Sequence, residues 1–256
     1  MTPPFEQSPA LAAISPLRHG FFGREGGYSE GQFAANNMSI ATGDKPHLVE
    51  ANRAGAAQAL GFLRKNLYLL KQVHSARVRT LTEYPDNNEP VEADAMVTRL
   101  PVLALGILTA DCTPILFADP EAGVIGASHA GWRGAVDGIC GATVDAMVAL
   151  GATPQNIIAA IGPTISGANY EVGERFKADF LALQPDGAGH FFVPPGKPVH
   201  FDLPRFVEAQ LRQSGIGTIE RVGGCTYAEP DRYFSHRYAT HQGTTTGRQV
   251  AVIGLT

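Results

Sequence analysis

The chain has 256 residues, 44% of them hydrophobic, and a formal net charge of -4 at pH 7. This length and composition allow a large buried core, in one big domain or two small ones. The slightly acidic balance, with no run of Lys or Arg, argues against nucleic acid or a membrane surface as the main partner. There is no apolar stretch long enough to span a bilayer, and residues 1–16 lack a signal-peptide pattern.

Three cysteines, at positions 112, 140 and 225, form no CxxC motif. An odd number of cysteines without such a motif is typical of reduced thiols and not of a disulfide framework. We therefore expect a cytoplasmic protein.

The hydrophobic pattern in the first two thirds of the chain predicts one helix and then mainly strands. Apolar residues recur at helical spacing over residues 48–60 and stop at Gly61, which predicts a helix. Short apolar runs bounded by Gly, Pro or Asp predict buried strands. These runs are residues 67–70, 102–108, 115–117, 124–127 and 157–161.

Further elements follow toward the C-terminus. An i, i+3, i+4, i+7 stripe over residues 134–150, closed by Gly151, predicts a helix. Helices are also expected at 169–183 and at 202–215, the latter opened by Asp202 and Pro204, and a last strand at 248–254. Strands and helices mix without strict βαβ alternation, so we expect an α/β fold with a single domain, a mixed β-sheet core flanked by α-helices.

Three residues of metal-ligand type stand where an apolar run meets a turn: His74, Cys112 and His129. Two imidazoles and one thiolate suit zinc, and three protein ligands leave the fourth tetrahedral position open, as in catalytic sites. The other interpretation of His129 is a tight strand-to-helix turn in which Trp132 packs. Of the remaining thiols, Cys140 lies on the apolar stripe of a helix, where a buried inert thiol is expected.

Asp111 precedes Cys112 directly and has two possible roles. It could act as an acid or base in catalysis. It could instead only orient a histidine ligand through the ring N–H. The sequence leaves these two roles open.

Several motifs together resemble the YfiH family, whose members are also called laccase-domain proteins, polyphenol oxidases and purine nucleoside phosphorylases. The resemblance runs from about His19 to the C-terminus. The most specific part is the His-Ala-Gly-Trp-Arg-Gly block with the upstream Asp-Cys pair. The motifs are Gln72-Val73-His74, Ala93-Asp94-Ala95, Ala110-Asp111-Cys112, His129-Ala130-Gly131-Trp132-Arg133-Gly134, Ile161-Gly162-Pro163, Tyr170-Glu171-Val172-Gly173, Cys225-Thr226-Tyr227 and Thr246-Gly247-Arg248.

The resemblance implies a catalytic α/β domain at residues 19–256 after an N-terminal extension at 1–18. It implies zinc held by His74, Cys112 and His129. The implied activity is phosphorolysis of adenosine, inosine, guanosine and methylthioadenosine, together with adenosine deamination. The sequence departs from the family at Thr164, where a Cys is common, and at residues 235–238, where a run such as Ser-Tyr-Arg-Arg is usual.

The number and spacing of the histidines in this chain test the oxidase label of the family. A multicopper oxidase needs about ten histidine ligands, mostly as His-X-His pairs, and this chain has eight histidines with no such pair. One His₂Cys site suits zinc, or copper as an alternative. A copper-dependent polyphenol oxidase and a peptidoglycan-editing role therefore stay as alternatives to the phosphorylase.

Purine nucleosides and phosphate are the partners that this resemblance implies, and phosphate requires cationic or N–H donors. The cations nearest to the motifs are Arg24, Arg53, Lys71 and Arg133. Asn37 follows a glycine-rich segment that is either a substrate loop or a cluster of turns. Cleavage of the glycosidic bond also needs a proton donor near the base, and Asp111 is the closest candidate.

Overall fold

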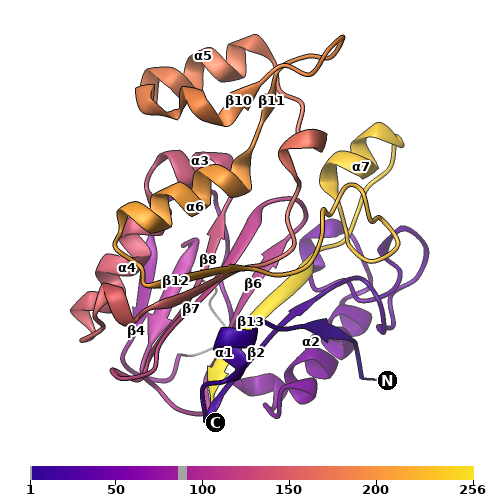
Figure 1. The fold of residues 1–256 in the computed structure, drawn as a ribbon. Helices are drawn as coiled ribbons and strands as arrows, with labels where there is room; N and C mark the ends of the chain where they lie inside the picture. Colours follow the sequence, from indigo (N-terminus) through magenta and orange to yellow (C-terminus); the bar gives the residue numbers. More distant parts are fainter. Residues whose placement is uncertain (1, 86–90) are drawn as a thin grey trace.

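The computed structural model describes residues 2–85 and 91–256, which form two β-sheets packed face to face (Figure 1). One sheet has the order β1-β2-β13-β6-β3, and the other has the order β12-β9-β7-β8-β5-β4. The strands of the first are β1 Phe5–Glu6, β2 Leu17–Phe22, β13 Gln249–Leu255, β6 Ala104–Thr109 and β3 Leu67–Leu69. Those of the second are β12 Thr218–Arg221, β9 Ile158–Ile161, β7 Thr113–Asp119, β8 Val124–Ala130, β5 Ala95–Thr98 and β4 Val78–Leu81.

The six-stranded sheet is buried on both faces, as alternation along β7 demonstrates. Ile115 and Phe117 pack in a cluster with side chains of several helices, whereas Leu116 and Ala118 face the core between the sheets. The helices on this outer face are α3 Trp132–Val136, α4 Ile139–Ala149 and α6 Leu203–Gln213. A strand buried on both sides is apolar throughout, which is why β7 reads as a continuous apolar run.

The five-stranded sheet is covered in the same way by α2 Pro46–Ala59. Along β13, Val250 and Val252 pack toward α2, and Ala251 and Ile253 face the other sheet. The layers therefore run helix, sheet, sheet, helix. This confirms the predicted α/β class with a mixed-sheet core flanked by helices.

The remaining elements lie at the rims of the sheets. In Figure 1, α5 Glu174–Leu183 and the hairpin of β10 Phe191–Phe192 with β11 His200–Phe201 extend beyond one end of the sheets. Helix α7 His236–His241 lies between them and the five-stranded sheet. Short helices complete the chain: α1 Pro9–Ala12, η1 Gly31–Phe33, η2 Ile40–Thr42, η3 Arg64–Asn66, η4 Pro154–Asn156, η5 Gly167–Asn169 and η6 Pro185–His190.

The structure differs from the predicted elements in three places. The helix expected at 134–150 is broken into α3 and α4, because Gly138 adopts a φ of 90° at the junction. The helix expected from 169 begins only at Glu174. The strand expected from 102 begins at Ala104, because Val102 has a φ of 57°, outside the β region.

Several strands escaped prediction, and β2 is the most consequential. It carries His19 and Gly20 within its length, so its apolar run is broken. Residues 1–18 contribute to the same fold: β1 pairs with β2, and Leu11 is fully buried in the core between the sheets. The boundary between an extension at 1–18 and a domain at 19–256 stays a prediction.

No helix in the described residues is both long and apolar enough to cross a membrane.

The buried imidazole of His19 makes stability depend on pH. Its Nε2 accepts a hydrogen bond of 2.9 Å from the backbone N–H of Ser8, and burial lowers the pKa of His19 to about 4. The folded state therefore favours the neutral ring. The contribution of the neutral His19 to stability should be full above pH 6.5 and be lost as the pH drops toward about 4, by about 3 kcal/mol in total.

Urea unfolding of the metal-free protein between pH 7 and pH 4 measures this loss. His19→Gln should be less stable at neutral pH but show a flatter pH dependence, whereas the exposed control His47→Gln should follow the wild type. An equal slope in His19→Gln and wild type would contradict the role of His19.

Candidate metal centre and its cavity

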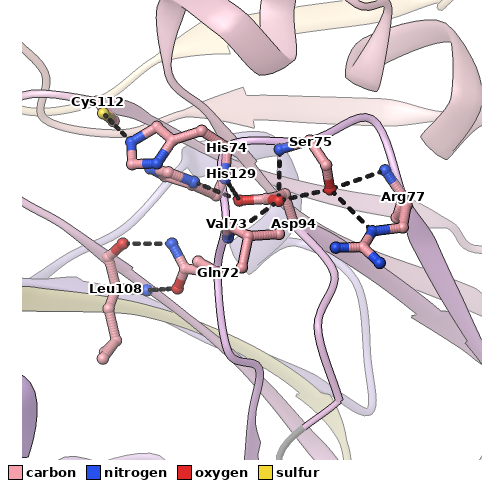
Figure 2. Close-up of polar contacts among 9 residues, drawn as sticks. All are labelled: Gln72, Val73, His74, Ser75, Arg77, Asp94, Leu108, Cys112 and His129. Carbon is pink, nitrogen blue, oxygen red and sulfur yellow. Dashed lines mark hydrogen bonds and ion pairs between the residues drawn. The ribbon is translucent and has the colours of Figure 1, made fainter.

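The three predicted ligands converge at one end of the β7–β8 pair. His129 lies in β8, Cys112 directly precedes β7, and His74 lies in the loop between β3 and β4. The antiparallel register pairs Thr113 with Ala130, so Cys112 lies beside the end of β8. The ligand atoms of the three residues all lie within 4.8 Å of one another, and Cys112 Sγ is 3.8 Å from His74 Nε2 (Figure 2).

A buried carboxylate orients two of the ligands. Asp94 Oδ1 accepts from His129 Nδ1 at 2.9 Å, which leaves His129 Nε2 for a metal. The same carboxylate accepts from the backbone N–H groups of Val73, His74 and Ser75 at 2.7–3.2 Å, as Figure 2 shows. Burial raises the pKa of Asp94, but the hydrogen bonds from His129 and Ser75 outweigh it and hold this pKa well below its usual range.

Gln72 ties the loop that carries His74 to the neighbouring strand. Its side-chain amide donates to the carbonyl of Leu108 at 2.7 Å and accepts from the N–H of Leu108 at 2.8 Å (Figure 2). His74 itself has a φ of 59°, a left-handed conformation that is uncommon for a residue with a side chain. The bonds of Gln72 and Asp94 on either side hold it there.

The arrangement fits a tetrahedral metal. Zn–S and Zn–N bonds of ordinary length put a sulfur and a nitrogen ligand about 3.6 Å apart, close to the Cys112–His74 separation. Gly131 permits this approach, because a Cβ there would lie 2.7 Å from His74 Cδ2 and 3.1 Å from Cys112 Sγ. These residues can therefore hold a metal ion, and the donor set of two imidazoles and a thiol suits zinc or copper.

The thiol and imidazole of the cluster also change each other's protonation. Burial would raise the pKa of Cys112, but the charge of His129 and hydrogen bonds from both imidazoles lower it to about 6. Burial would lower the pKa of His129, and the Cys112 thiolate and Asp94 raise it to about 9. The thiolate, which is the metal-binding form of cysteine, is therefore favoured at neutral pH.

Asp111 lies beside the cluster but its carboxylate is turned to neighbouring loops. Oδ1 accepts from the hydroxyl of Thr226 and Oδ2 from the backbone N–H of Arg237, each at 2.6 Å. Its carbonyl accepts from Thr164 Oγ1 and from the N–H of Ile165. Asp111 thus anchors the start of α7 and two loops next to Cys112, and its catalytic role stays a prediction.

The cluster opens into a cavity of about 690 Å³ with a cationic wall. Of the predicted substrate residues, Arg53 and Lys71 line this cavity. Sequence reasoning did not select the other basic residues on its wall: Arg64, His236 and Arg248. Arg248 belongs to one of the family motifs, but nothing in its spacing relates the start of the last strand to Cys112.

The other three predicted substrate residues lie outside the lining of this cavity. Arg24 donates to the carbonyls of residues 34 and 230 and lies 4.8 Å from the ring of Phe234. Asn37 is fully buried and bonds to its own loop and to the N–H of Arg248. Arg133 is exposed and lies over Trp132. Their roles in substrate binding stay predictions.

Gly131→Ala should weaken metal binding, because the added methyl group meets His74 and Cys112 at less than van der Waals distance. We expect a loss of affinity of about tenfold or more, as for other changes that misplace metal ligands. Zinc content after dialysis against a competing chelator measures it. Gly141→Ala is the control, since its nearest neighbour would be Ser214 Oγ at 3.9 Å. Equal metal retention in both variants would refute the close approach.

Alkylation of Cys112 by iodoacetamide should report its lowered pKa. In metal-free Cys225→Ser protein, the rate should rise with a midpoint near pH 6, since the thiolate is present above its pKa. Cys140 is fully buried and its pKa is raised to about 12, so it should not react. His129→Gln removes the positive charge and should move the midpoint upward. A midpoint at the usual thiol value of about 8.5 in the Cys225→Ser protein with His129 intact would exclude the pairing of Cys112 with His129.

The comparisons with known proteins agree on one family. The family model described as multi-copper polyphenol oxidoreductase laccase matches residues 18–256. The purine nucleoside phosphorylase of Deinococcus radiodurans is 43% identical over 252 residues, covering 98% of this chain and 93% of the relative. The purine nucleoside phosphorylase of Corynebacterium glutamicum is 38% identical over 241 residues, covering 94% of this chain and 95% of the relative.

Solved structures agree as well. The Bacillus licheniformis hypothetical protein YfiH has a TM-score of 0.85 at 29% identity, covering 94% of this chain and 93% of that chain. YlmD from Geobacillus stearothermophilus has a TM-score of 0.83 at 29% identity, covering 99% of each chain. The chain described here therefore belongs to the family of multi-copper polyphenol oxidoreductase laccase proteins, the YfiH-like proteins that its motifs resemble.

Proposed function

We propose that this protein is a zinc-dependent purine nucleoside phosphorylase acting on adenosine, inosine, guanosine and methylthioadenosine. The observation that carries the proposal is the His74, Cys112 and His129 group, which opens into a cavity with a cationic wall. Relatives 37–43% identical over most of the chain bear the name purine nucleoside phosphorylase. A cytoplasmic location, favoured by three free thiols, belongs to the same proposal.

The cavity wall supplies what a phosphate requires. Arg53 donates Nε to the carbonyl of Met38 and Nη1 to Glu50, which leaves its Nη2 without a hydrogen-bond partner in the described residues. Arg248 donates Nη1 to the carbonyls of Thr246 and Gly247, and has no carboxylate partner in the part of the chain described. Both guanidinium groups therefore keep donors for an anion.

The reaction would join a phosphate oxygen to C1′ of the ribose as the bond from C1′ to N9 breaks. The electron pair of that bond leaves with the purine, and the proton of the hydrogen phosphate ends on the free base. The products are ribose 1-phosphate and the base. Arg53 and Arg248 would hold the phosphate in position for this displacement.

Zinc would be held by His129 Nε2, His74 Nε2 and Cys112 Sγ, and when bound would act as a Lewis acid at the ribose or base. Asp94 fixes the tautomer of His129, and Gln72 and Asp94 fix the loop of His74. Adenosine deamination at the same centre is the second part of the proposal. Water would add its oxygen to C6 of adenosine as the bond from C6 to the amino nitrogen breaks, giving inosine and ammonia with no need for phosphate.

The alternative is a copper-dependent polyphenol oxidase, which the description of the matching family model favours. Within residues 2–85 and 91–256, a single group of side chains could hold a metal ion, and it consists of His74, Cys112 and His129. One such group cannot hold the several copper ions of a multicopper oxidase. Oxygen consumption that scales with tightly bound copper would favour this alternative.

Zinc-loaded protein incubated with inosine or adenosine should release free base and ribose 1-phosphate only when phosphate is present, as measured by chromatography. Cys112→Ala should lose both zinc and base release, whereas the buried control Cys140→Ala should keep both. Arg248→Met should raise the KM for phosphate about tenfold or more, because it removes charge-assisted hydrogen bonds. No base release by the zinc form with phosphate present would refute the proposal.

A further inference from the structure

A second cavity, of about 530 Å³, lies next to the group of His74, Cys112 and His129, called the metal-type cluster below. No step described so far uses this cavity. Aromatic and aliphatic side chains line it together with one cation and one carboxylate, so its surface is about as polar as it is apolar. The side chains that define it are Trp132, Tyr170, Glu171, Val172, Phe176 and Arg237.

Three observations place this second cavity near the cluster. Trp132 follows Gly131, where an added Cβ would meet His74 and Cys112. The backbone N–H of Arg237 donates to Asp111, the residue before Cys112. The neighbouring residues 236 and 237 line different cavities, since His236 is on the wall of the first and Arg237 on that of the second. The two cavities therefore adjoin at the start of α7.

The walls of the second cavity match a flat heteroaromatic ring. Trp132 and Phe176 meet edge to face with ring centroids 4.8 Å apart and form an aromatic part of the cavity wall, while the guanidinium of Arg133 lies over the indole at 5.3 Å. The guanidinium carbon of Arg237 lies 5.1 Å from the ring centroid of Tyr170, and its Nη1 donates to the carbonyl of Glu171. Nε and Nη2 of Arg237 have no hydrogen-bond partner among the described residues, so they are available to ring nitrogens or a carbonyl.

The remaining polar groups complement those donors. The hydroxyl of Tyr170 has no hydrogen-bond partner in the described chain, and burial together with the charge of Cys112 raises the pKa of Tyr170, so it stays a donor. The carboxylate of Glu171 is half-exposed and lies 3.3 Å from His241 Nε2 and 3.9 Å from Arg237 Nη1, through the same oxygen, so its other oxygen is left for a ligand. It can accept from an N–H or amino group of a base. Hydrogen-bond donors and acceptors thus lie beside the aromatic side chains of the second cavity.

We propose that this second cavity is the subsite for the purine base, with phosphate held in the first cavity and the ribose beside the metal-type cluster. The inference rests on the proposed phosphorylase function. In a displacement at C1′ the incoming phosphate and the departing base lie on opposite faces of the ribose, so binding regions for anion and base on either side of the sugar suit the reaction. A cavity with a cationic wall adjoining one with aromatic side chains has this arrangement.

Trp132 makes the test direct, because it is the single tryptophan of the chain. Titration with hypoxanthine, excited where the purine does not absorb, should change the emission of Trp132 saturably, and inorganic phosphate alone should not. Arg237→Met keeps the side-chain length but removes the donors, and should raise the Kd for hypoxanthine about tenfold. Arg175→Met, an exposed arginine outside both cavities, should leave that Kd unchanged. No saturable change, or an equal Kd in Arg237→Met and wild type, overturns the proposal.

Kinetics separate this inference from the function on which it rests. If the protein is a phosphorylase, Arg237→Met should raise the KM for inosine and leave the KM for phosphate unchanged. An unchanged KM for inosine in an active enzyme would overturn the base subsite while the phosphorylase stands. Saturable binding of hypoxanthine, weakened in Arg237→Met, by a protein without phosphorolysis would leave the base subsite standing and refute the phosphorylase.

Discussion

The carboxylate of Asp94 holds two of the three residues of the metal-type cluster, His129 and His74, in position. A buried carboxylate is costly unless donors surround it, and Asp94 is fully buried with its donors supplied by His129 and by the loop at residues 73–75. It joins the six-stranded sheet, which carries His129, to the loop that carries His74, a loop that Gln72 also ties to Leu108. The same interaction sets the tautomer of His129 and the place of His74, so the geometry of two ligands depends on one side chain.

The register of β7 and β8 provides the third ligand. Because antiparallel pairing puts the start of β7 against the end of β8, Cys112 meets the turn after His129, where Gly131 leaves room for the sulfur. Asp111 has a φ of 88°, an uncommon conformation for a residue with a side chain. Its hydrogen bonds to Thr226 and Arg237 hold that conformation. The backbone around Cys112 is therefore fixed by contacts from distant parts of the chain.

Charge is divided unevenly along the wall of the first cavity. Glu50 bonds to both Arg53 and Arg64, so those two guanidinium groups share one carboxylate. Lys71 pairs with Glu92 at the surface. Arg248 donates hydrogen bonds to carbonyls alone among the described residues, and its charge also interacts with those of Cys112 and Asp111. The second cavity offers aromatic surfaces instead, and this difference between the two chambers suits a substrate pair of unlike chemistry.

The sequence by itself determined the elements with a strong local signal and the identity of the metal-type group. Helix α2, the buried strands β7 and β9, and α6 with its Asp202 cap follow from apolar spacing and capping, which act over a few residues. His74, Cys112 and His129 were selected from ligand type and position at strand ends, which is information each residue carries alone. Strand β2 was missed because buried His19 and Gly20 interrupt its apolar run.

Only the tertiary structure decided which other residues surround that group. Asp94, Arg248, Tyr170 and Arg237 come to the site from four separate segments, and long-range strand pairing and loop packing brought them there. The same packing kept Arg24, Asn37 and Arg133 outside the lining of the first cavity, although the sequence had suggested them as substrate residues together with Arg53. A side chain's type is local and can be read from the sequence, whereas its distance from a metal ligand depends on the whole fold.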